Sequence, residues 1–171
     1  MRTFIACPVE RNELTDEILG DLKLVKGLSP VRTPELHITL HFFGDTSEVL
    51  AGKISSGLMN LKFPGFRIEM SGLGCFPSVK RPRVIYIGVK GFQRGLYDSV
   101  LKAAGIKAGD GEFVPHITVG RIRETVDVQN LIKKYEDAEF GSPEIKMVCY
   151  YRSDLKPTGP VYTEIVCAQL M

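Results

Sequence analysis

The stretch His-Ile-Thr-Leu at residues 37–40 recurs as His-Ile-Thr-Val at residues 116–119, each time among apolar residues. These two repeats hold two of only three histidines in 171 residues. On a β-strand, side chains at positions i and i+2 share one face and lie about 6.6 Å apart. Each repeat therefore predicts a strand that presents an imidazole beside a threonine hydroxyl, with Ile38 or Ile117 buried on the opposite face.

Hydrophobic spacing and turn residues around the repeats predict a mixture of strands and helices. The expected strands are Arg2–Cys7, Leu36–Phe43, Phe66–Phe76, Arg83–Val89, Val114–Ile122, Ile145–Tyr151 and Val161–Leu170. The expected helices are Glu13–Val25, a segment from Thr46 or Ser47 to about Leu61, Phe92–Ala104 and Val126–Tyr135.

The two repeats lie about half a chain length apart, which suggests two lobes related by a pseudo-twofold axis. Strands joined by hairpins and mixed with helices indicate an α+β protein. We expect one bilobal domain spanning residues 1–171, in which two largely antiparallel sheets face a central cleft with helices on the outside.

The composition is that of an ordinary globular protein, with 44% hydrophobic and 25% charged residues and a formal net charge of +2. Such a mild charge argues against a protein that coats nucleic acid nonspecifically. The dense basic segment Lys80–Arg83 has two interpretations, a solvated loop or a contact with phosphates. The N-terminus lacks the continuous apolar run of a signal peptide, and no segment reaches transmembrane length, so we expect a cytoplasmic protein without membrane contact.

Four cysteines are scattered along the chain, at Cys7, Cys75, Cys149 and Cys167. None forms a Cys-x-x-Cys pair, and none has a histidine close by in sequence. Three of the four lie within apolar strand-like runs. We therefore expect buried, reduced thiols rather than a disulfide framework or a zinc site.

Two imidazoles in matched settings indicate acid–base catalysis by His37 and His116, because one can be neutral while the other is charged at the same pH. In-line displacement at phosphorus places the entering and leaving oxygens on opposite sides. Two symmetry-related imidazoles suit that geometry. The hydroxyls of Thr39 and Thr118 could then donate to nonbridging oxygens, where charge gathers.

The third histidine, His41, shares the predicted face of His37 but lies about 13 Å from it along an extended strand. Two histidines four residues apart chelate zinc when they lie on a helix, whereas on a strand they are not neighbours. No cluster of carboxylates lies at either repeat to complete a ligand set. We expect no metal and no other cofactor.

At this point the sequence resembles the two-histidine (2H) phosphoesterase superfamily, whose signature is a pair of H-x-T-x motifs. It is most similar to the RNA 2′,3′-cyclic phosphodiesterase branch, which is also called 2′-5′ RNA ligase-like. The resemblance rests on the segments R-T-F-I-A-C-P at residues 2–8, E-L-H-I-T-L-H-F-F-G-D at 35–45, G-L-G-C-F-P at 72–77, P-R-V-I-Y-I-G-V at 82–89, P-H-I-T-V-G-R at 115–121, Y-Y-R-S-D-L at 150–155 and G-P-V-Y at 159–162. Together these segments span nearly the whole chain.

The resemblance implies hydrolysis of an RNA 2′,3′-cyclic phosphate end to a 2′-phosphomonoester, with reversible 2′-5′ ligation as a further activity. It implies that His37 donates a proton to the departing 3′ oxygen and that His116 activates water, although the pseudo-symmetry makes the two roles chemically interchangeable. Arg121 matches a basic residue of the family that binds substrate. Its odd offset from His116 would place it on the opposite face unless the strand bends, and Gly120 is where a bend could occur.

Aromatic side chains are candidates for stacking an RNA base. Tyr86 and Tyr151 lie in strands that could line the cleft, and Phe43 is out of phase with His37, yet packing in the core is our expectation for each. The expected partner is RNA with a 2′,3′-cyclic phosphate end, tRNA fragments included, and we expect a monomer. Two alternatives stay open, a phosphodiesterase for cyclic nucleotides or 2′-5′-oligonucleotides and an RNA-binding module without catalysis.

Overall fold

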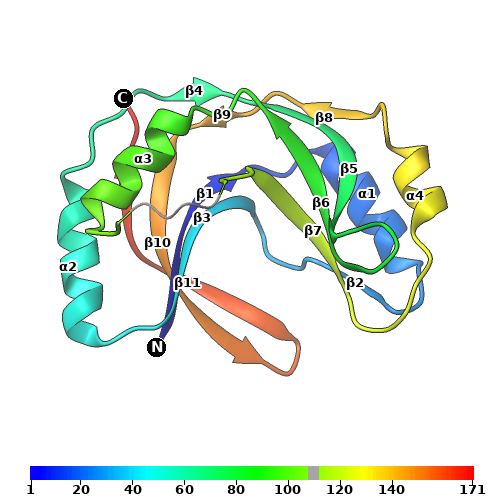
Figure 1. The fold of residues 1–171 in the computed structure, drawn as a ribbon, viewed down its shortest axis with the longest axis horizontal. Coiled ribbons are helices and arrows are strands. Elements are labelled where there is room, and N and C mark those ends of the chain that lie inside the picture. Colours follow the sequence, from blue (N-terminus) through cyan, green and yellow to red (C-terminus); the bar gives the residue numbers. More distant parts are fainter. Residues whose placement is uncertain (108–111) are drawn as a thin grey trace.

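The structure is a computed structural model that describes residues 1–107 and 112–171 (Figure 1). Its strands are β1 (Arg2–Val9), β2 (Leu28–Pro30), β3 (Leu36–Asp45), β4 (Phe66–Arg67), β5 (Glu69–Pro77), β6 (Pro82–Lys90), β7 (His116–Ile122), β8 (Glu139–Gly141), β9 (Glu144–Ile145), β10 (Met147–Lys156) and β11 (Gly159–Gln169). Its helices are α1 (Glu13–Lys23), α2 (Glu48–Met59), α3 (Arg94–Ala103) and α4 (Gln129–Lys134). The predicted α+β class is confirmed, and both repeats lie on strands as predicted.

The strands of the described residues form a nine-stranded sheet in the order β11-β10-β1-β3-β7-β6-β5-β8, with β2 paired to β7. Neighbouring strands run antiparallel, as the sequence predicts. The two groups of strands that we expected as separate sheets are joined where Ile38 of β3 pairs with Ile117 of β7. Both isoleucines are fully buried, so this junction is anchored in the core.

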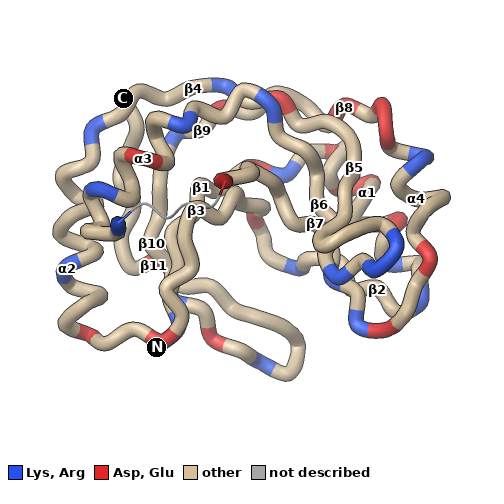
Figure 2. Tube along the Cα trace, in the orientation of Figure 1, with Lys and Arg blue, Asp and Glu red and all other residues tan. Residues whose placement is uncertain are grey.

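Two lobes flank this junction, and each takes segments from both halves of the sequence (Figure 1). The first lobe contains β1, β3, β10 and β11, with α2 packed against β11 and α3. The second lobe contains β2, β5, β6, β7 and β8, with α1 packed against β2, β7 and β8, and α4 against β5. Helix α1 thus follows β1 in sequence but packs in the other lobe. Figure 2 shows that charged residues of both signs are spread over both lobes.

Helix α1 illustrates how local sequence sets these elements. The Asn12 side chain accepts hydrogen bonds from the backbone N–H groups of Leu14 and Thr15, and the Thr15 hydroxyl accepts one from the Asn12 N–H. This capping box satisfies backbone donors that a helix start leaves without partners. Ile18 and Leu22 then enter the main hydrophobic core, which also contains Ile38 and Ile117.

The segment Phe66–Phe76, which we predicted as one long strand, is divided at Ile68 into β4 and β5. The Ile68 N–H donates to the Pro143 carbonyl, and the Ser142 hydroxyl donates to the Ile68 carbonyl. Strand β4 pairs with β9 in a separate two-stranded sheet. The division follows because the backbone at Ile68 bonds to a loop distant in sequence rather than to a strand of the main sheet.

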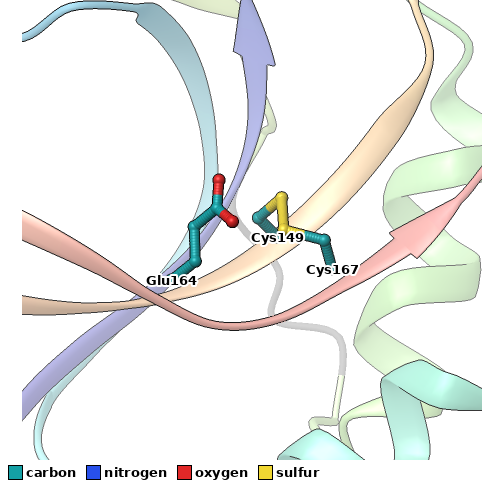
Figure 3. A group of neighbouring side chains, drawn as sticks. All are labelled: Cys149, Glu164 and Cys167. Carbon is teal, nitrogen blue, oxygen red and sulfur yellow. A yellow bond between two sulfur atoms is a disulfide. The ribbon is translucent and has the colours of Figure 1, made fainter.

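The expectation of four reduced thiols is wrong for one pair of cysteines. Cys149 of β10 and Cys167 of β11 lie opposite each other, with 4.1 Å between their Cα atoms, and form a disulfide (Figure 3). Cys7 and Cys75 are free and buried, as expected. The spacing of the cysteines in the sequence does not indicate this disulfide, because the pairing depends on the register of the β10–β11 hairpin.

None of the helices that the structure describes is long and apolar enough to cross a membrane.

Candidate active site

The four residues of the repeats meet around the junction between the lobes. Because Ile38 pairs with Ile117 in antiparallel strands, the same register carries His37 beside Thr118 and Thr39 beside His116. These four side chains alternate with the buried isoleucines and therefore share the opposite face of the sheet. Each imidazole thus has two threonine neighbours, its own at position i+2 and the other repeat's across the strands.

Both repeats contain a β-bulge at their fourth residue. In β3, Ala6 of β1 pairs with Thr39 while Ile5 pairs with His41, so Leu40 is the additional residue. In β7, Tyr86 pairs with Thr118 while Ile85 pairs with Gly120, so Val119 is the additional residue in the second repeat. A bulge shifts the alternation of side chains by one residue. The pseudo-symmetry of the sequence therefore extends to the irregularities of its strands.

The second bulge determines the position of Arg121. Ile117, Val119 and Ile122 are buried while Arg121 is exposed, so the shifted alternation places Arg121 on the face of His116 and Thr118. Burial lowers the pKa of His37 and raises that of Tyr162, and the nearby charge of Arg121 adds to the fall at His37 and offsets part of the rise at Tyr162. The residue before Arg121 is Gly120, and its lack of a side chain suits this tightly packed part of the strand. A Cβ at this position would lie 3.1 Å from side-chain atoms of both Leu22 and Leu28.

The first bulge moves His41 away from the site. His41 pairs with Ile5, whose side chain lies in the main core, and its ring contacts Phe43 edge-on at 4.7 Å between centroids. Phe43 packs against the main core, as expected. The prediction that His41 shares a face with His37 and Thr39 is therefore wrong. The additional residue Leu40 interrupts the alternation of side chains between the two faces, so His41 does not follow the pattern that starts at His37.

His37 lies in an aromatic setting within the first lobe. Its ring centroid is 5.5 Å from that of Phe4 and 5.4 Å from that of Tyr162, which approaches edge-on. Burial, followed by the nearby charges of Arg121 and His116, lowers the pKa of His37 to about 4. Its imidazole is therefore neutral at pH 7 in the protein without substrate.

His116 has a different setting within the second lobe. Its Nδ1 lies 2.9 Å from the carbonyl oxygen of Val114. A carbonyl only accepts hydrogen bonds, so we assign the proton to Nδ1, which leaves Nε2 to exchange a proton with substrate. The rings of Phe76 and Tyr86 stack on each other at 4.4 Å and contact the imidazole of His116 at 4.8 and 5.4 Å between centroids.

Sequence analysis missed several aromatic neighbours of the histidines. Phe4, Phe76 and Tyr162 all contact a catalytic candidate, although each lies in a segment that carries the family resemblance. The expectation of core packing is wrong for Tyr86, which is half-buried and contacts His116. Tyr151 is buried as expected and stacks on Phe4 at 5.1 Å. The missing information is the order of strands, because β1 and β11 reach His37 only through the folded sheet.

A pocket of about 370 Å³ opens beside His37. Its walls come from the loop before β3 and from the β10–β11 hairpin, and they include aromatic, acidic and basic side chains. The basic segment Lys80–Arg83 does not line this pocket: Lys80 and Arg81 are exposed in the turn between β5 and β6, and Arg83 is exposed at the start of β6. Its two interpretations stay predictions.

Comparisons with known proteins show the family of this chain and its fold. The family model described as LigT like Phosphoesterase matches residues 5–86 and 93–162. A curated RNA 2′,3′-cyclic phosphodiesterase of Archaeoglobus fulgidus is 36% identical over 173 residues, covering 96% of this chain and 98% of the relative. One of Aquifex aeolicus is 34% identical over 165 residues, covering 90% and 88%. The crystal structure of E. coli LigT in apo form shares the fold, with a TM-score of 0.75 at 22% identity over 99% of this chain and 97% of that one.

Proposed function

The chain belongs to the LigT-like phosphoesterase family of the 2H superfamily and is an enzyme of that family, and from this premise we propose that it hydrolyses 2′,3′-cyclic phosphate ends of RNA to 2′-phosphomonoesters. The observation that carries the proposal is the meeting of two His-Thr pairs around the Ile38–Ile117 junction. Curated relatives named for this activity match almost end to end, which supports the substrate class.

In the proposed reaction, water attacks phosphorus in line with the bond to the 3′ oxygen. His116 Nε2 accepts the proton of water, and the Val114 carbonyl at Nδ1 stabilises the imidazolium that forms. The P–O3′ bond breaks, and His37 gives its proton to the departing oxygen. The product keeps its phosphate on the 2′ oxygen.

His37 must gain a proton before it can act as the acid, since it is neutral at pH 7 without substrate. The phosphodiester brings a negative charge, which favours the charged imidazole and raises its pKa. Arg121 and the hydroxyls of Thr39 and Thr118 would contact the nonbridging oxygens. These groups can meet the charge of the phosphate, so we propose catalysis without a metal.

The same residues would support 2′-5′ ligation when a 5′-hydroxyl of RNA takes the place of water. Attack then breaks the same P–O3′ bond and yields a 2′-5′ diester. We further propose that residues 1–171 act as one bilobal catalytic domain, as a monomer in the cytoplasm, with RNA fragments such as tRNA halves among its substrates.

The test is hydrolysis of a short RNA that ends in 2′,3′-cyclic phosphate, with the product phosphate located by ³¹P NMR. We expect a 2′-phosphate product, unchanged turnover after EDTA treatment, and loss of turnover in His37→Ala and His116→Ala. Cleavage of free cyclic nucleotides or 2′-5′-oligonucleotides without cleavage of RNA ends would favour the alternative phosphodiesterases. RNA binding without turnover would favour a binding module.

A further inference from the structure

The pocket beside His37 differs in chemistry from the centre where phosphate would bind. Glu35 and Glu164 contribute two carboxylates to its walls, and Arg32 contributes one cation. The aromatic side chains of Tyr151 and Tyr162 complete its polar and aromatic surface. Such walls disfavour a second phosphate and suit a flat, uncharged group that carries hydrogen-bond donors.

The two carboxylates act together at one place in the pocket. Tyr151 of β10 pairs directly with Glu164 of β11, so their side chains share a face. Burial, followed by the charges of Glu164 and Glu35, raises the pKa of the Tyr151 hydroxyl. The disulfide between Cys149 and Cys167 links β10 and β11 beside these residues, and the Glu164 carboxylate lies within 4.8 Å of both sulfur atoms (Figure 3).

The position of the pocket identifies the part of the substrate that reaches it. His37 lines the pocket and, in the proposed reaction, protonates the 3′ oxygen of the terminal ribose. The ribose that carries this oxygen must lie on the same side of phosphorus as His37, and its base extends from there. On the opposite side, the stacked Phe76 and Tyr86 pack against His116.

We propose that this pocket binds the terminal base of the RNA and that Glu164 makes the enzyme prefer a 3′-terminal guanosine. Guanine presents N1–H and N2–H side by side, which matches the two oxygens of one carboxylate. Uracil is the least favourable base, because two carbonyl oxygens flank its N3–H and repel the carboxylate. Adenine and cytosine each offer one amino group and fall between them. The inference rests on the proposed function, because that reaction places the terminal ribose beside His37.

The experiment compares four short RNAs that differ only in the terminal nucleotide, each ending in 2′,3′-cyclic phosphate. We expect kcat/KM to be about tenfold higher for guanosine than for uridine, as for one charged hydrogen bond. Glu164→Gln should remove most of this preference, because it weakens the contact with guanine and relieves the repulsion of uracil, so kcat/KM should fall for guanosine and rise for uridine. Asp154→Asn is the matched control, since Asp154 lies on the same hairpin, pairs with Arg152 and does not line the pocket.

Calorimetric binding of 2′-GMP and 2′-UMP separates this inference from the proposed function. Tighter binding of 2′-GMP that Glu164→Gln abolishes would support the pocket even if no RNA end were cleaved, in which case the proposed function alone would fail. Equal turnover and equal binding of the guanosine and uridine forms would overturn the inference and leave the proposed function intact. An identical loss of preference in Asp154→Asn would also overturn it, because the effect would then be one of overall charge.

Discussion

The same four-residue repeat has two different environments in the two lobes. In the first lobe, His37 is surrounded by Phe4 and Tyr162, and burial lowers its pKa to about 4. In the second lobe, the Nδ1 atom of His116 lies 2.9 Å from the backbone carbonyl oxygen of Val114, and the stacked rings of Phe76 and Tyr86 contact the imidazole. Sequence symmetry therefore sets where the imidazoles lie, whereas residues from other strands give each imidazole a different environment.

The proposed reaction gives the two imidazoles of this symmetric pair different roles. One imidazole must accept a proton while the other donates one, so identical environments would not distinguish the two roles. The pocket adds a second difference, because it opens beside His37.

The largest expected effect is the loss of either histidine. His37→Ala and His116→Ala should each reduce turnover of a cyclic-phosphate RNA by about 10²–10⁴-fold, because each removes a proton-transfer group. Single-turnover kinetics would measure the loss, and circular dichroism would confirm that the variants are folded. Near-normal turnover in either folded variant would contradict the acid–base assignment.

The threonines test whether the crossed arrangement of the repeats matters. Thr39→Val and Thr118→Val keep the β-branched shape and delete one hydroxyl each. We expect kcat/KM to fall by up to roughly 10²–10³-fold, as for loss of a donor to transition-state charge. The two limbs of the plot of kcat/KM against pH should stay at nearly the same pH values, because both histidines remain. If a valine variant kept the wild-type kcat/KM, the hydroxyl of the replaced threonine would have no role in catalysis.

The lowered pKa of His37 predicts a dependence of stability on pH. The folded protein holds this pKa at about 4, below the ordinary value of 6.5, so the unfolded chain binds more protons between these values. The contribution of His37 is present above pH 6.5 and is lost as the pH falls toward 4, by at most about 3 kcal/mol. Denaturation at pH 7 and pH 4.5 should show a smaller difference for His37→Ala than for wild type. If wild type and His37→Ala lost the same amount of stability between pH 7 and pH 4.5, groups other than His37 would cause the acid sensitivity.

Arg121 connects the second lobe to the histidine of the first. Arg121→Gln should lower kcat/KM by about tenfold, because a charged contact to phosphate is lost. It should also raise the pKa of His37, measured by NMR titration, since the Arg121 charge contributes to lowering it. Arg123→Gln is the control, because Arg123 is exposed just beyond β7. Equal effects of the two substitutions would reduce Arg121 to a surface cation.

The smallest effect is expected at His41, the histidine that the bulge at Leu40 turns away from the site. His41→Ala should keep kcat/KM within about threefold of wild type, well under 1 kcal/mol of barrier. The same assay as for His37→Ala measures it. A loss as large as that of His37→Ala would mean that the strand presents His41 to the substrate after all.

Much of the molecule could be predicted from local patterns. The alternation in each repeat predicted the buried Ile38 and Ile117, and apolar spacing predicted α1 to within two residues at its end. The odd offset of Arg121 required a bend, and the bulge at Val119 provides one. The short strands β2 and β8 had no such signal, because three residues become a strand only when a partner is placed beside them.

The sequence by itself determined the two strands that carry histidine and threonine, because the period of two is a property of one strand alone. Only the tertiary structure decided which face His41 takes, that Cys149 meets Cys167, and that Tyr162 lies against His37. Each of these depends on the register between strands far apart in the chain. That register follows from packing the whole core, so no single segment contains it.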